Sequence, residues 1–255
     1  MADLADMVRR HDPDRFFCAL FAPAARRDAL STLYAFNYEL ARAHEAAREP
    51  ALALIRLQWW REVVEGAERR HEVATPLAAL IAQGILPPAP LLSMIEAREA
   101  EIDVPKTLDV FLGLMRGGPG ALAVAAGIAL GADTAVQARL RDLGAAGGVA
   151  GTLRNVPALA RHQRCLLPRD LLEAAGLVPE AAFSDPDAVL AATCTALVSR
   201  AFSLLGRPEK LPRAVVAAAL PAIFVRRDLV RGAPIGPRGV GDRWAVLWAA
   251  ARRMV

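Results

Sequence analysis

Cysteine is scarce in this chain. Its three cysteines, Cys18, Cys165 and Cys194, are odd in number and far apart, which excludes a disulfide framework and a zinc site built from paired thiolates. Lysine is scarcer still, because Lys106 and Lys210 are the only two, so arginine supplies almost all of the positive charge. The formal net charge of +4 is too small and too dispersed to predict a nucleic-acid-binding protein. It is compatible with acidic partners, phosphates or an anionic lipid surface.

The chain also lacks a long uninterrupted apolar run. The two longest, residues 121–131 and 214–225, fall well short of the roughly 20 residues needed to cross a bilayer. Residues 1–11 carry acidic and basic side chains and no apolar core, unlike a secretory signal. The sequence therefore predicts no transmembrane segment and a cytoplasmic location.

Strand patterns are missing as well, because no stretch alternates β-branched and polar residues over the length of a strand. Apolar residues recur at helical spacing almost throughout, and Thr75 before Pro76 and Asp185 before Pro186 predict helix starts. The Gly-rich stretches 117–120 and 232–241 are predicted to be loops. We expect roughly eight to ten helices without a long polar linker, and hence one all-α domain spanning residues 1–255.

Two tryptophans near the C-terminal end lie four residues apart. Trp244 and Trp248 therefore share one face of a predicted terminal helix. The favoured interpretation is that both rings pack on the rest of the bundle. The alternative is an exposed contact with a partner or a membrane.

Two blocks of sequence carry a family resemblance. Residues 15–45 read RFFCALFAPAARRDALSTLYAFNYELARAHE, and residues 148–172 read GVAGTLRNVPALARHQRCLLPRDLL. They resemble the two conserved blocks of the squalene/phytoene synthases. The resemblance implies an isoprenoid-synthase-type helical bundle with a central cavity. In those enzymes each block carries a pair of aspartates one helical turn apart, which hold Mg²⁺ against the diphosphate of a prenyl substrate.

The aspartate positions of both blocks are altered in this chain. The resemblance places Ala41 and Glu45 where the first pair belongs, and Asn155 and Leu159 where the second pair belongs. One carboxylate, Glu45, remains, which is too few to hold a cluster of Mg²⁺ ions. The resemblance therefore implies a non-catalytic relative with no catalytic residue, no metal site and no cofactor. Mg²⁺ would be required only if the chain were an active prenyl transferase.

The altered pattern has a resemblance of its own. AFNYELA in the first block, LQWW after it and LRNVP in the second are similar to the branch of the family that contains a mitochondrial assembly factor of respiratory complex I. This similarity implies a helper in the assembly of NADH dehydrogenase. Its expected partner is a complex I subunit or assembly intermediate, and its expected location includes the inner face of the cytoplasmic membrane. Two alternatives stay open: a prenyl transferase that joins two isoprenyl diphosphates, and an isoprenoid-binding protein.

Five residues of the two blocks are candidates for ligand binding: Tyr34, Tyr38, Arg154, Arg161 and Arg164. Arg154 and Arg164 match basic positions that lie near diphosphate in the enzymes. Losing carboxylates while keeping arginines predicts an electropositive cavity mouth, which would favour an anionic lipid or an acidic protein segment. The opposing interpretation is that Arg154 pairs with an acid inside the cavity, because an unpaired buried arginine is costly.

Overall fold

The computed structural model describes residues 4–45, 50–232 and 238–255, and gives only the backbone of His44, Glu45 and Pro50. Its N-terminal half consists of α1 (Leu4–His11), α2 (Pro13–Ala19), α3 (Ala24–Glu45), α4 (Pro50–Val64), α5 (Ala74–Ala82), α6 (Pro88–Ala100), α7 (Leu108–Met115), the π-helical turn η1 (Arg116–Gly120) and α8 (Ala121–Ala129). The C-terminal half consists of α9 (Thr134–Arg161), α10 (Arg169–Ala174), α11 (Ala181–Ser184), α12 (Pro186–Leu205), α13 (Val216–Ala219), α14 (Pro221–Arg231) and α15 (Val240–Arg252). The described residues contain no strand, which confirms the all-α prediction.

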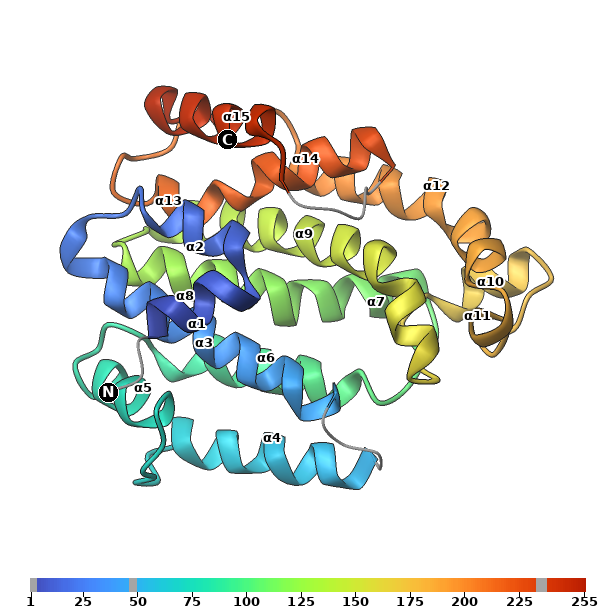
Figure 1. Cartoon of the computed structure of the whole chain (residues 1–255), viewed down its shortest axis with the longest axis horizontal. Coiled ribbons are helices and arrows are strands. Elements are labelled where there is room, and N and C mark those ends of the chain that lie inside the picture. The colour runs from blue at the N-terminus through green and yellow to red at the C-terminus, as the bar shows by residue number, and fades with distance from the viewer. Residues whose placement is uncertain (1–3, 46–49, 233–237) are drawn as a thin grey trace.

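The bundle is built around α9, its longest helix. α9 packs against η1 and α8 on one side and against α12 and α14 on the other. Figure 1 shows α3, α6 and α4 extending the bundle away from α9 in one direction, and α14 and α15 extending it in the other. Capping side chains begin α9 and α12. Asp133 accepts a hydrogen bond from the Val136 N–H at 2.9 Å, and Asp185 accepts one from the Ala188 N–H at 3.0 Å.

Three sequence-based boundaries are wrong. The predicted loop 232–241 extends too far, because Val240 and Gly241 belong to α15, and residues 233–237 lie outside the described part of the chain. α5 begins at Ala74, and its N-cap position is Val73, so Thr75 is a helical residue and not a cap. Residues 117–120 are not a loop, because they form the turn η1 that joins α7 to α8. Glycines make this possible by letting the backbones of η1 and α9 meet: a Cβ added at Gly144 would lie 2.4 Å from the Pro119 carbonyl oxygen.

Because η1 joins α7 to α8, the three elements form one helical stretch that is long enough to be compared with a membrane span. Two helical stretches, Leu108–Ala129 and Pro186–Leu205, are long and apolar enough to cross a bilayer by length and composition alone. A count of uninterrupted apolar runs misses the first, because Arg116 and the glycines of η1 interrupt it. The bundle buries 61% of the apolar window of Leu108–Ala129, as it would for a core helix. In Pro186–Leu205 the exposed positions include Asp187, Thr195 and Arg200.

Candidate functional site

The altered aspartate positions lie around one cavity between α3 and α9. Asn37 and Ala41 come from α3 and face Gly151, Asn155 and Leu159 of α9 across a space of about 390 Å³. Glu45 ends α3, and its side chain lies outside the described residues. The structure thus brings together the three other positions that the family resemblance selected.

A smaller inner chamber of about 110 Å³ adjoins this cavity. Both spaces are lined by Arg15, Pro119, Leu122, Gly147 and Arg154, so the inner chamber continues the outer one. The buried Tyr34 ring lines the inner chamber, and burial raises the pKa of its phenol well above the ordinary range. Charged side chains contribute to the lining of both chambers, together with apolar ones.

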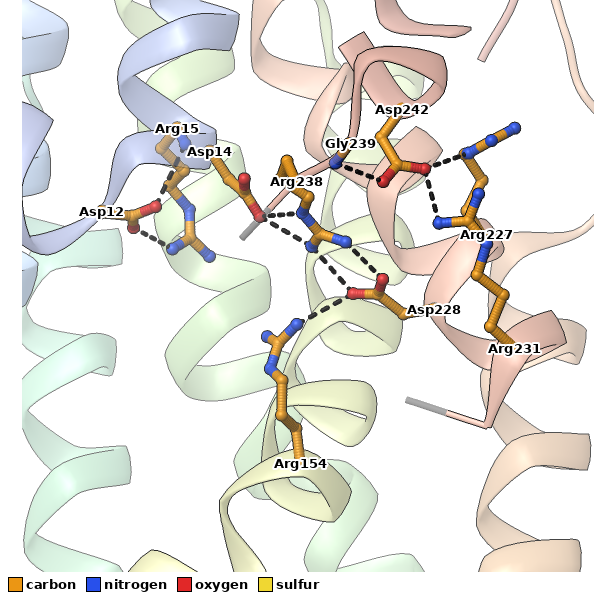
Figure 2. A network of polar contacts seen from close by, with 10 residues as sticks. All are labelled: Asp12, Asp14, Arg15, Arg154, Arg227, Asp228, Arg231, Arg238, Gly239 and Asp242. Atoms are coloured by element: carbon orange, nitrogen blue, oxygen red, sulfur yellow. Dashed lines mark hydrogen bonds and ion pairs between the residues drawn. The ribbon is translucent and has the colours of Figure 1, made fainter. Parts of the chain in front are cut away.

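Asp228 is the centre of a buried ionic network in the inner chamber (Figure 2). Its side chain is 2% exposed and accepts hydrogen bonds from Arg154 and Arg238, each at 2.8 Å. Arg238 also donates two hydrogen bonds to Asp14, at 2.7 and 2.9 Å, and its guanidinium lies 4.6 Å from the centroid of the Phe224 ring. The network joins α2, α9 and α14 to Arg238, which lies two residues before α15.

Electrostatics favour this arrangement. Burial alone would lower the pKa of the Arg238 guanidinium, but its hydrogen bonds to Asp228 and Asp14 outweigh that effect and raise it above the usual value. Arg238 therefore stays charged and holds two carboxylates that would otherwise repel each other. Arg15 pairs with Asp12 in the same way beside the chamber.

A second buried carboxylate, that of Glu101, lines the outer cavity. Glu101 accepts hydrogen bonds from Arg98 at 3.0 Å, and a nitrogen of Arg164 lies 3.7 Å from its carboxylate. The same Arg164 nitrogen donates to the Glu101 carbonyl oxygen at 3.2 Å. Arg164, one of the candidate ligand-binding residues, therefore lines the cavity while already engaged with an acid.

The charges of the two chambers nearly cancel. Their described lining contains five arginines and four carboxylates, namely Arg15, Arg98, Arg154, Arg164, Arg238, Asp12, Asp14, Glu101 and Asp228. Each of these arginines has at least one of these carboxylates as its partner. The electropositive mouth that the sequence predicted is thus reduced to a formal charge of +1. A diphosphate entering here would have to displace ion pairs that already exist.

The donor set does not fit the Mg²⁺ of the related enzymes. Mg²⁺ takes hard oxygen ligands in octahedral array, and carboxylates are its usual protein donors. Ala41 and Leu159 offer no side-chain oxygen, and Asn155 offers one amide oxygen. The described residues contain no group of three or more metal-ligating side chains, and the cavity carboxylates are bonded to arginines.

The remaining candidates lie elsewhere. Tyr38 stacks on His11 with ring centroids 4.0 Å apart, and Arg161 is exposed at the end of α9. Neither is among the described residues that line the two chambers. Sequence reasoning missed Asp14, Asp228 and Arg238. Asp228 could have been noticed, because it follows Phe224 by one helical turn on the buried face of an arginine-rich helix.

The chain matches one protein family and several solved structures. The family model for squalene/phytoene synthase matches residues 8–233. Among solved structures, a dehydrosqualene synthase in complex with ligand superimposes with a TM-score of 0.75 at 14% identity, covering 97% of this chain and 94% of that one. Squalene synthase HpnC from Alicyclobacillus acidocaldarius superimposes with a TM-score of 0.65 at 18% identity, covering 98% of this chain and 92% of that one. At these identities the likeness shows the fold.

Four mammalian relatives carry the name NADH dehydrogenase (ubiquinone) complex I, assembly factor 6. The Rattus norvegicus protein is 31% identical over 102 residues, which are 38% of this chain and 31% of that protein. The Homo sapiens protein is 28% identical over the same length and shares, so these matches span about a third of either relative. The Mus musculus protein is 24% identical over 227 residues, 86% of this chain and 68% of its own length.

Proposed function

The chain belongs to the squalene/phytoene synthase family, and from this premise we propose that it is a non-catalytic member that aids assembly of respiratory NADH dehydrogenase. One observation carries the proposal: internal ion pairs engage the arginines and carboxylates of the cavity where prenyl synthases would bind metal and diphosphate. The similarity to assembly factor 6 of several animals supports a role in complex I assembly.

Physical chemistry supports the loss of the ancestral reaction. Ionising an allylic diphosphate creates a leaving group with several negative charges, which needs Mg²⁺ to stabilise it. Among the described side chains, the acids that line the two chambers are Asp12, Asp14, Glu101 and Asp228, and each is paired with an arginine. Recruiting them for Mg²⁺ would leave partly buried arginines without their ion-pair partners, which is unfavourable.

The retained cavity favours a second candidate. A space of about 390 Å³ is within the range of small-molecule sites, and Gly151 keeps its wall open. An isoprenoid or an anionic lipid is therefore a candidate ligand, held by shape and by exchange with the existing ion pairs. Binding of such a ligand is compatible with an assembly role and does not require prenyl transfer.

We expect purified protein with Mg²⁺ and farnesyl or geranylgeranyl diphosphate to form no squalene or phytoene. The reason is that Ala41, Asn155 and Leu159 cannot supply the carboxylates that the reaction needs. Product extraction and mass spectrometry against a no-enzyme blank provide the measurement. Product above that blank that disappears in Glu45→Ala would establish catalysis and contradict the proposal.

Deleting the gene is expected to lower the amount of assembled NADH dehydrogenase and to leave carotenoids and hopanoids unchanged. An assembly helper limits the complex, whereas a synthase limits the isoprenoid. Native gels with an in-gel NADH oxidation stain measure the first quantity, and lipid mass spectrometry measures the second. Glu45→Ala should complement as well as the wild-type gene. Loss of an isoprenoid with full complex I activity would support the prenyl transferase alternative instead.

A further inference from the structure

The last helix of the bundle turns an apolar face outward. On α15, Val240, Trp244, Leu247 and Trp248 are 73%, 66%, 40% and 62% exposed. Their spacing of four, seven and eight residues places them on one side of the helix. The favoured sequence-based interpretation, that both tryptophans pack on the bundle, is wrong, because the opposite side of α15 makes that contact.

The rotation of α15 is fixed from its inner side. Val246 and Ala249 are buried against the bundle, and the carboxylate of Asp242 is 6% exposed. That carboxylate accepts hydrogen bonds from Arg227 at 2.6 Å and Arg231 at 2.7 Å, and it caps the Gly239 N–H at 3.2 Å. Ion pairs to two arginines lower the pKa of Asp242, so it stays charged and holds the helix in place at neutral pH.

The exposed stripe is flanked by positive charge. Arg243 and Arg252 are exposed and lie on either side of it, and the Arg252 guanidinium stands 4.1 Å from the centroid of the Trp248 ring. Neither arginine forms an ion pair with any residue of the described chain. Asp242, the only acidic residue of α15, points inward. Unlike the arginines of the cavity, these two are uncompensated.

We propose that α15 is the surface by which this protein lies on an anionic lipid bilayer. An apolar stripe containing tryptophan with arginine on both flanks is the pattern of a helix lying in the membrane interface. Tryptophan rings occupy the headgroup region, and arginines beside them pair with anionic lipid phosphates. The 13 residues of α15 give an axis of roughly 20 Å along the membrane plane. This inference does not depend on the assembly role.

The test is flotation of the purified full-length protein with vesicles of phosphatidylcholine alone, or of phosphatidylcholine mixed with phosphatidylglycerol. We expect binding to the mixed vesicles that weakens by about tenfold or more without the anionic lipid, and that falls as salt screens the arginines. Replacing both tryptophans, Trp244→Ser with Trp248→Ser, should abolish binding. Arg243→Gln with Arg252→Gln should reproduce the loss caused by removing the anionic lipid.

Matched controls come from α4, at the opposite edge of the bundle in Figure 1. Leu52 and Ile55 are 46% and 65% exposed, so Leu52→Ser with Ile55→Ser removes a comparable apolar surface. This variant should bind mixed vesicles like the wild type, and unchanged thermal melting should show that every variant is folded. The proposal is overturned if the wild type does not float, if the tryptophan variant floats equally well, or if the stripe instead forms a dimer on size-exclusion chromatography that does not bind vesicles.

Discussion

Replacing Arg238 with methionine is expected to lower the free energy of unfolding by about 3–5 kcal/mol. Methionine keeps much of the side-chain volume but removes the charge that lies between Asp14 and Asp228. Asp228 is 2% exposed, so the substitution leaves a buried carboxylate with Arg154 as its remaining partner. The expected loss exceeds that of a surface ion pair, which is worth about 1 kcal/mol or less.

Urea denaturation followed by the helical circular-dichroism signal measures this change, and a fall in melting temperature on the order of 10 °C should accompany it. Arg243→Met is the control, because Arg243 is exposed and should shift stability by about 0.5 kcal/mol or less. Adding Asp228→Asn to Arg238→Met should restore part of the lost stability, because a neutral amide costs less to bury than a carboxylate that has lost one of its two arginines. If Arg238→Met were as stable as Arg243→Met, the network would not stabilise the fold.

The second large effect concerns the contact between α9 and η1. Gly144→Ala is expected to destabilise the protein by about 1–3 kcal/mol or more, because overpacking a backbone contact forces helices apart. The new Cβ would lie 2.4 Å from the Pro119 carbonyl oxygen and 2.9 Å from the Gly120 Cα. Backbone atoms cannot rotate away as a side-chain end would, so α9 or η1 must shift.

Gly151 provides the matched control two helical turns further along α9. A Cβ added there meets nothing within 4 Å, so Gly151→Ala should stabilise the protein by about 0.5–1 kcal/mol through helix propensity. The same substitution is thus expected to change stability in opposite directions at two positions of one helix. The urea midpoints of both variants, each compared with the wild type, measure the sign of the two changes in stability. Equal stabilisation of both would mean that the contact at Gly144 is looser than the structure shows.

The local sequence determined the helical class and several helix ends. Asp185 caps α12 as its position before Pro186 predicts, since a capping bond joins residues that are near neighbours in the chain. The two sequence blocks also carried the family resemblance, and with it the positions Ala41, Asn155 and Leu159 that line the cavity. Motifs of this kind are read residue by residue, so no packing information is needed to find them.

Tertiary structure alone decided the rest. Arg238 and Asp14 are 224 residues apart in the chain, and no local pattern links them. The local sequence around Gly117, Gly118 and Gly120 predicts a loop, because glycine has a poor helix propensity. In the folded protein these residues are helical, because close packing against the glycines of α9 stabilises the turn. The outward face of α15 was ambiguous because alanine, valine and tryptophan surround most of the helix. The ion pairs of Asp242 with α14 fix its rotation, and that contact exists only in the folded bundle.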